Sequence, residues 1–102
     1  MALRHQVFFW LANPDSEEDR AKLIAGLEAM RAIPLIRELH VGVPAHTEER
    51  PGVDGSFSVS ELMLFDSFED QAAYQVHPLH RKFVEEHEHL WVKHVVYDTI
   101  DA

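Results

Sequence analysis

The sequence contains no cysteine. The chain can therefore form neither a disulfide framework nor a thiolate metal site, and it has no cysteine nucleophile. Glycine is also scarce, with 4 residues, and the chain has no glycine-rich loop of the kind that cradles phosphate groups. It likewise has no serine in the context of a nucleophile elbow.

Positively charged residues are also few. Lys and Arg number 9 against 18 Asp and Glu, which gives a formal net charge of −9 at pH 7. The basic residues are scattered and form no stripe along the chain. Because nucleic acid attracts clustered positive charge, we expect no nucleic-acid partner.

Long apolar runs are absent too. None approaches the roughly 20 residues that a helix needs to cross a bilayer. The first ten residues, ending in Val-Phe-Phe-Trp, are too short for a signal peptide and lack its small-residue cleavage site. We therefore expect a cytoplasmic protein that does not associate with a membrane.

The length of 102 residues fits one domain, and no linker, repeat or low-complexity tract divides it. We therefore expect residues 1–102 to form a single domain. Ser16 (or Asp15) and Ser67 are suited to be helix N-caps, and Pro78 suits the first turn of a helix. Strands are expected at 4–11, 35–43, 57–65 and 93–100, and helices at about 16–32, 68–76 and 79–90.

This order predicts an α+β, ferredoxin-like fold: a four-stranded antiparallel sheet with helices on one face. In the first strand, Val7 and Phe9 share a face with His5, while Phe8 and Trp10 lie on the other face. Both faces are thus apolar, and the helices cover only one. A symmetric homodimer, sheet against sheet, would cover the other and form a dimeric α/β barrel.

The loop expected at 44–56 is polar, rich in Pro and Gly, and longer than the usual connection of ~4–6 residues. Loops of this kind are either mobile lids over a binding site or plain surface hairpins, and the sequence leaves both alternatives open.

The densest group of reactive side chains is the segment 74–83, Tyr-Gln-Val-His-Pro-Leu-His-Arg-Lys-Phe. Pro78 breaks the helix, so Tyr74 ends one helix and His80 begins the next. A histidine can remove a proton near neutral pH, and a tyrosine hydroxyl can stabilise an enolate. The pair suits proton abstraction beside a carbonyl, although both side chains, and the helix cap His77, also have purely structural interpretations.

The 8 histidines do not form a recognisable metal motif. His77 and His80 straddle the proline break, and His87 and His89 point in different directions on one helix. Residues 85–89, Glu-Glu-His-Glu-His, are typical of a solvated helix face. We expect no metal and no cofactor.

A set of short motifs is spread over nearly the whole chain and resembles the stress-responsive dimeric α/β-barrel (Dabb) family. The motifs are Arg4-His5, Ile33-Pro34, Val41-Gly42, the Phe-Asp-Ser-Phe-Glu-Asp step at 65–70, the Tyr-x-x-His-Pro-x-His element at 74–80, and Tyr97-Asp98. The resemblance implies a ferredoxin-like fold and a homodimer.

One branch of this family, the olivetolic acid cyclases, folds linear polyketides by cofactor-independent aldol chemistry. The resemblance implies acid/base roles for Tyr74 and His80 and a supporting role for His5. It also places a further pocket histidine of that branch at about Val59, which is apolar here. This departure implies a pocket that is drier, smaller or built for another substrate.

The expected function is that of a stress-responsive dimeric α/β-barrel protein of undefined biochemical activity, as for some members of this family. One alternative is a cofactor-independent cyclase, isomerase or lyase that acts on a carbonyl or polyketide-like small molecule through His80, Tyr74 and His5. Another is a small-molecule binding protein or a cofactor-free monooxygenase. The sequence does not decide whether the chain is an enzyme.

Overall fold

A single four-stranded antiparallel sheet organises the computed structural model, which describes residues 2–102. The strand order is β2-β3-β1-β4, so β1 lies between β3 and β4. The strands are β1 (Leu3–Leu11), β2 (Glu38–Gly42), β3 (Val59–Phe65) and β4 (Trp91–Ile100).

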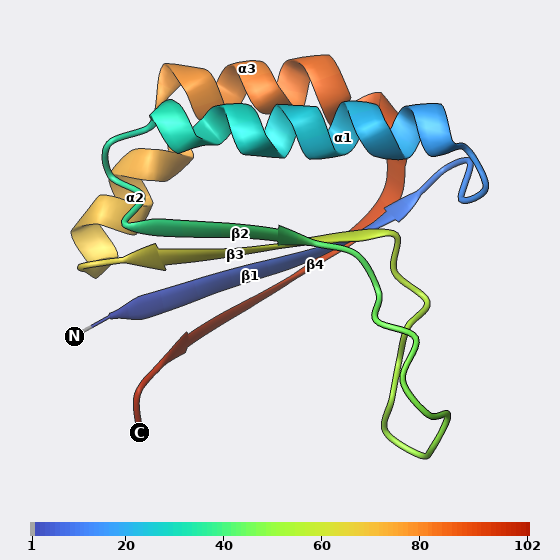
Figure 1. The fold of residues 1–102 in the computed structure, drawn as a ribbon. Coiled ribbons are helices and arrows are strands. Elements are labelled where there is room, and N and C mark those ends of the chain that lie inside the picture. The colour runs from blue at the N-terminus through green and yellow to red at the C-terminus, as the bar shows by residue number, and fades with distance from the viewer. Residues whose placement is uncertain (1) are drawn as a thin grey trace.

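The helices all lie on one face of this sheet (Figure 1). The helices α1 and α3 run side by side above it, and α2 lies near the end of β3. The predicted ferredoxin-like α+β fold is therefore confirmed. The helices are α1 (Glu17–Ala29), α2 (Phe68–Gln75) and α3 (Pro78–His87), with 3₁₀ turns at Met30–Ala32 and Glu88–Leu90. Within residues 2–102, none of the helices has the length and apolar character needed to span a bilayer.

The strand β1 alternates strictly between its two faces, as predicted. Val7 and Phe9 are buried beneath the helices together with His5, whereas Phe8 and Trp10 are half-buried on the opposite face. The same alternation in β3 buries every second residue from Val59 to Phe65. Because successive side chains in a strand point to opposite faces, these odd-numbered positions form the floor of the core.

The second strand is shorter than the predicted 35–43. After Pro34 the chain turns, with the Ile36 amide donating to the Ile33 carbonyl at 3.2 Å. Leu35 and Ile36 pack against the core from this turn, so burial explains their apolar character without a strand. The chain between β2 and β3 contains no helix or strand and extends away from the body of the protein (Figure 1).

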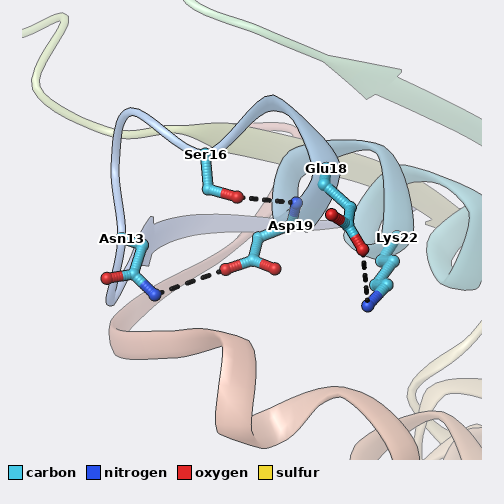
Figure 2. Close-up of polar contacts among 5 residues, drawn as sticks. All are labelled: Asn13, Ser16, Glu18, Asp19 and Lys22. Atoms are coloured by element: carbon cyan, nitrogen blue, oxygen red, sulfur yellow. Dashed lines mark hydrogen bonds and ion pairs between the residues drawn. The ribbon is translucent and has the colours of Figure 1, made fainter.

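The helix starts confirm the predicted caps. The Ser16 hydroxyl accepts a hydrogen bond from the Asp19 amide at 3.1 Å (Figure 2). The Ser67 hydroxyl likewise accepts one from the Asp70 amide at 3.1 Å. At the start of α3, His77 Nδ1 accepts from the Leu79 amide at 3.1 Å. The side chain of His77 is thus used as a cap.

His87 departs from the prediction of a solvated helix face. Its ring stacks on Phe83, with ring centroids 5.0 Å apart, and its Nδ1 lies 2.8 Å from the Phe83 carbonyl. The ring also lies 2.5 Å from the place that a Cβ of residue 26 would occupy. Gly26 therefore leaves the space that His87 fills between α1 and α3.

The cap of α1 gives a first test of this structure. Ser16→Ala leaves the Asp19 amide without its partner, and we expect it to lower the free energy of unfolding by ~1 kcal/mol. Lys22→Ala removes only the exposed pair with Glu18 (Figure 2) and should cost at most ~0.5 kcal/mol. Urea denaturation measures both. Equal losses in the two variants would contradict the assigned cap.

Candidate functional site

A cavity of about 230 Å³ lies between the helix-covered face of the sheet and the helices α2 and α3. All three residues singled out from the sequence, His5, Tyr74 and His80, line it. Its apolar wall includes Val7 and Phe9 of β1 and side chains of α3 and β4. The titratable residues that line it are His5, Glu61, Tyr74, His80, Glu88 and His94.

His5 is held in place by a carboxylate. It is 4% exposed and lies directly opposite Asp98 in the β1–β4 register. The distance between His5 Nδ1 and Asp98 Oδ1 is 2.6 Å. The Asp98 carboxyl group is placed to accept the Nδ1 proton, and this interaction fixes the orientation of the ring. A carboxylate that orients a histidine in this way is a recurring part of acid–base sites.

Tyr74 stands at the end of α2 and is buried, with 1% of its surface exposed. Its ring centroid lies 4.5 Å from that of His80 and 5.9 Å from that of His5. Burial, reinforced by Glu61, raises the pKa of the Tyr74 hydroxyl, which therefore keeps its proton. The hydroxyl donates only to a weak acceptor, Met30 Sδ at 3.9 Å.

His80 lies in the first turn of α3 and is half-buried. Its Nδ1 lies 3.1 Å from the Gln75 carbonyl. Since a carbonyl can only accept, Nδ1 carries the proton and Nε2 carries the lone pair. Burial lowers the pKa of His80, an effect that the bond to Gln75 opposes and the neighbouring His5 adds to. A neutral imidazole with a free Nε2 can act as a base.

Glu61 and Asp98 were not predicted as site residues. Glu61 lies in the middle of β3 between Val7 and Val41 of the neighbouring strands. It is 3% exposed, and its Oε2 has no hydrogen-bond partner among residues 2–102. Burial raises the pKa of Glu61 to about 8. The alternation of β3 between its two faces, which puts Glu61 on the core side, could have revealed it.

Val59, the position that the family resemblance pairs with a pocket histidine, is fully buried in the core and does not line the cavity. The polar group that β3 contributes comes instead two residues later, from Glu61. The cavity is therefore not dry on this side, because β3 supplies a carboxyl group from a different position. Among residues 2–102, no group of three or more His, Asp or Glu side chains is placed to hold a metal ion.

The burial of Glu61 predicts a pH-dependent stability. In the unfolded chain its carboxyl ionises near pH 4.5, whereas in the folded chain it holds its proton to about pH 8. The unfolded state thus loses the proton first, so the free energy of unfolding falls as pH rises between these two values, by at most ~1.4 kcal/mol per unit. In Glu61→Gln, the free energy of unfolding should no longer show the part of its fall with pH that Glu61 causes. Urea denaturation at a series of pH values measures it, and identical slopes in the two proteins would refute it.

Comparison with solved structures finds the same fold at low sequence identity. A Dabb family protein with a ferredoxin-like fold from Mesorhizobium loti is 18% identical, with a TM-score of 0.82 over 99% of this chain and 97% of that one. A dimeric ferredoxin-like protein of unknown function from Thermobifida fusca is 20% identical, with a TM-score of 0.77 over 97% and 90%.

A hydroxynitrile lyase from Passiflora edulis is 24% identical, with a TM-score of 0.77 over 99% of this chain and 94% of that one. Identities this low show the shared fold alone, and the fold hosts proteins of unknown function as well as an enzyme. No functionally curated protein matches the sequence.

The family model of the stress responsive A/B barrel domain, Dabb, matches residues 3–101. This range spans all four strands and all three helices, including the Tyr-x-x-His-Pro-x-His element and the opening Arg4-His5. The chain belongs to the Dabb family of stress responsive A/B barrel domains.

Proposed function

We propose that the chain is a cofactor-independent enzyme that transfers protons next to the carbonyl group of a small molecule. The observation that carries this proposal is the convergence of His5, Tyr74 and His80 on one cavity, from three different elements. The neutral imidazole of His80 supplies an acceptor of protons, and the protonated phenol of Tyr74 supplies a donor. Perturbed pKa values in a cavity of this kind are typical of functional sites.

In this proposal each of the three side chains has its own role. His80 Nε2 is the base that removes a proton from the carbon beside the carbonyl. The electron pair of the broken C–H bond moves onto the carbonyl oxygen, where the Tyr74 hydroxyl stabilises the charge. His5, oriented by Asp98, positions the substrate. Return of the proton to another carbon gives an isomerase, and loss of a leaving group from the enolate gives a lyase.

The size of the cavity narrows the substrate class. At about 230 Å³ it lies below the ~300–1,000 Å³ that is usual for ligand pockets. It suits a small carbonyl compound better than a long polyketide chain. The structural similarity to a hydroxynitrile lyase adds a small cyanohydrin to the first substrate panel. There the same base would take the hydroxyl proton, the C=O bond would form as the C–C bond breaks, and cyanide would leave and take up the proton.

The proposal is tested with mandelonitrile and a panel of small ketones, with turnover followed by NMR in D₂O. We expect exchange or cleavage of at least one compound, and a loss of at least ~100-fold in His80→Ala, since a positioned base contributes ~10²–10⁴-fold. Tyr74→Phe should also slow the reaction.

The matched control is His89→Ala, the same change at an exposed histidine outside the cavity. Circular dichroism checks that each variant is folded. Equal rates in His80→Ala and His89→Ala would overturn the assignment of the base. The proposed function would be overturned if no compound reacts and none shifts the NMR signals of the His5 and His80 rings. Binding without turnover would also overturn it and would identify a binding protein instead.

We also propose that the chain forms a homodimer through the face of the sheet that the helices do not cover. Phe8 packs there against Phe57 and Tyr97, with ring centroids 4.9 and 6.1 Å apart. Tyr97 is 58% exposed, so this aromatic cluster is partly open to solvent in the single chain. The Thermobifida fusca protein of the same fold is described as dimeric. Leu62 and Leu64 lie on the same face.

A charge in the middle of this face should prevent assembly. Leu62 pairs with Gln6 of β1 and His40 of β2, so it lies near the centre of the uncovered face. We expect Leu62→Lys to be a folded monomer in light scattering, because an unpaired charge would be buried at the interface. Val76→Lys, at an exposed position on the helix side, should stay dimeric. A monomeric wild-type chain, or a dimeric Leu62→Lys, would contradict this interface.

A cytoplasmic location and a role in a stress response stay predictions. The family name supports a stress connection.

A further inference from the structure

Glu61 is placed where the fold gains nothing from a carboxyl group. Its cross-strand neighbours Val7 and Val41 are apolar, and its side chain lies on the core face of β3. A buried polar atom without a hydrogen-bond partner costs ~1–3 kcal/mol of stability. An apolar side chain of similar size would avoid that cost. Residues that violate the local rule of burial in this way are typical of functional sites.

Glu61 belongs to the cavity. Glu61 lines it together with Tyr74 and the two histidines, while its Oε2 is itself buried and lacks a partner among the residues described. Burial, and then the charge of an ionised Glu61, raise the pKa of Tyr74. The Tyr74 hydroxyl itself has only the weak sulfur acceptor of Met30. Both residues thus line one cavity, and neither polar group has a strong hydrogen-bond partner among the residues described.

The groups around Glu61 determine whether its carboxyl group is protonated. No Lys or Arg lines the cavity, so no fixed cation is present there to pair with a carboxylate. The other titratable groups that line it are His5 of β1, Tyr74 of α2, His80 of α3, Glu88 of the following 3₁₀ turn and His94 of β4. Of these, His80 is held neutral by burial and Tyr74 keeps its proton. A protonated carboxyl, which can donate a hydrogen bond, fits this environment.

We propose that the Glu61 carboxyl and the Tyr74 hydroxyl together form an oxyanion hole, which binds neutral small molecules through an acceptor oxygen of the carbonyl type. This inference rests on the proposed function, since it assigns the ligand of the same cavity. Each group donates its own proton to the ligand oxygen. A ligand that bears an ammonium group is disfavoured, because the carboxyl would first have to give up its proton. A neutral carboxylic acid paired with a tyrosine is a known solution for stabilising an enolate.

The proton balance of the proposed reaction is closed. When His80 takes the proton from carbon, the charge that develops on the ligand oxygen is shared between the two donors. If the Glu61 proton passes to that oxygen, the products are a neutral enol, a glutamate anion and an imidazolium ion. The same two protons return when the enol becomes a ketone again. The step consumes no cofactor, oxidant or reductant.

The protonation of Glu61 is tested without any ligand. The infrared spectrum of the wild-type protein should contain the C=O band of a buried protonated carboxyl at neutral pH, and the band should disappear as the pH rises past about 8. Glu61→Gln should lack this band. A wild-type spectrum without the band at neutral pH would overturn the proposal.

Ligand binding is tested with acetophenone and benzylamine, which have similar size and differ in carrying an acceptor oxygen or a cation. Wild-type protein should bind acetophenone more tightly than benzylamine in calorimetry at neutral pH. Glu61→Gln, whose amide still donates, should bind acetophenone within about 3-fold of wild type, since direct donation is preserved. Glu61→Met should weaken binding by about 10-fold, the effect of one lost hydrogen bond of ordinary strength.

The control variant is Glu86→Met, at an exposed acidic position of α3 outside this cavity, which should leave acetophenone affinity unchanged. Equal affinity in wild type and Glu61→Met, or no binding of acetophenone to the wild type, would overturn the proposal. Tighter binding of benzylamine, lost in Glu61→Gln, would do so as well, because it would assign a carboxylate that binds cations.

The two proposals fail in different ways. If the cavity binds acetophenone through Glu61 but no compound of the panel is turned over, the oxyanion hole stands as a binding site and the enzymatic proposal fails. If His80→Ala abolishes turnover while Glu61→Met leaves both turnover and binding unchanged, the enzymatic proposal stands and the oxyanion hole fails.

Discussion

The pairing of β1 with a strand on each side is the constraint on which the candidate site depends. One register sets Val7 opposite Glu61 of β3, and the other sets His5 opposite Asp98 of β4. Because the side chains of paired residues in an antiparallel sheet share a face, these polar groups all lie on the helix-covered side. A slip of one residue in either register would send His5 or its partner to the opposite face. The core and the site are therefore specified by the same hydrogen bonds.

The second part of the site comes from the break between α2 and α3. Pro78 cannot continue α2, and His77 caps α3 with its own side chain. The break brings the ring of Tyr74, at the end of one helix, next to the ring of His80 at the start of the next. The two ring centroids are 4.5 Å apart. In a continuous helix, two residues that are six positions apart would lie on different faces. The proline thus brings the phenol and the imidazole together over the sheet.

The sequence predicted the parts of this protein that depend on local chemistry. The alternation in β1, the serine caps and the proline break each follow from neighbouring residues, and each is found in the structure. The family resemblance brought His5 into the site. Asp98 could not be predicted as its partner, because the β1–β4 register depends on contacts between distant segments. Glu61 was overlooked although its inward position follows from alternation, since a glutamate in a strand usually faces water.

The central claim is that this cavity binds a small carbonyl compound and presents it to His80. A crystal structure of the protein with acetophenone tests the claim most directly. The account predicts that the carbonyl oxygen lies within hydrogen-bond distance of both the Tyr74 hydroxyl and the Glu61 carboxyl, with the methyl carbon facing His80 Nε2. Acetophenone bound outside the cavity, or inside it with the oxygen turned away from Tyr74 and Glu61, would contradict the account.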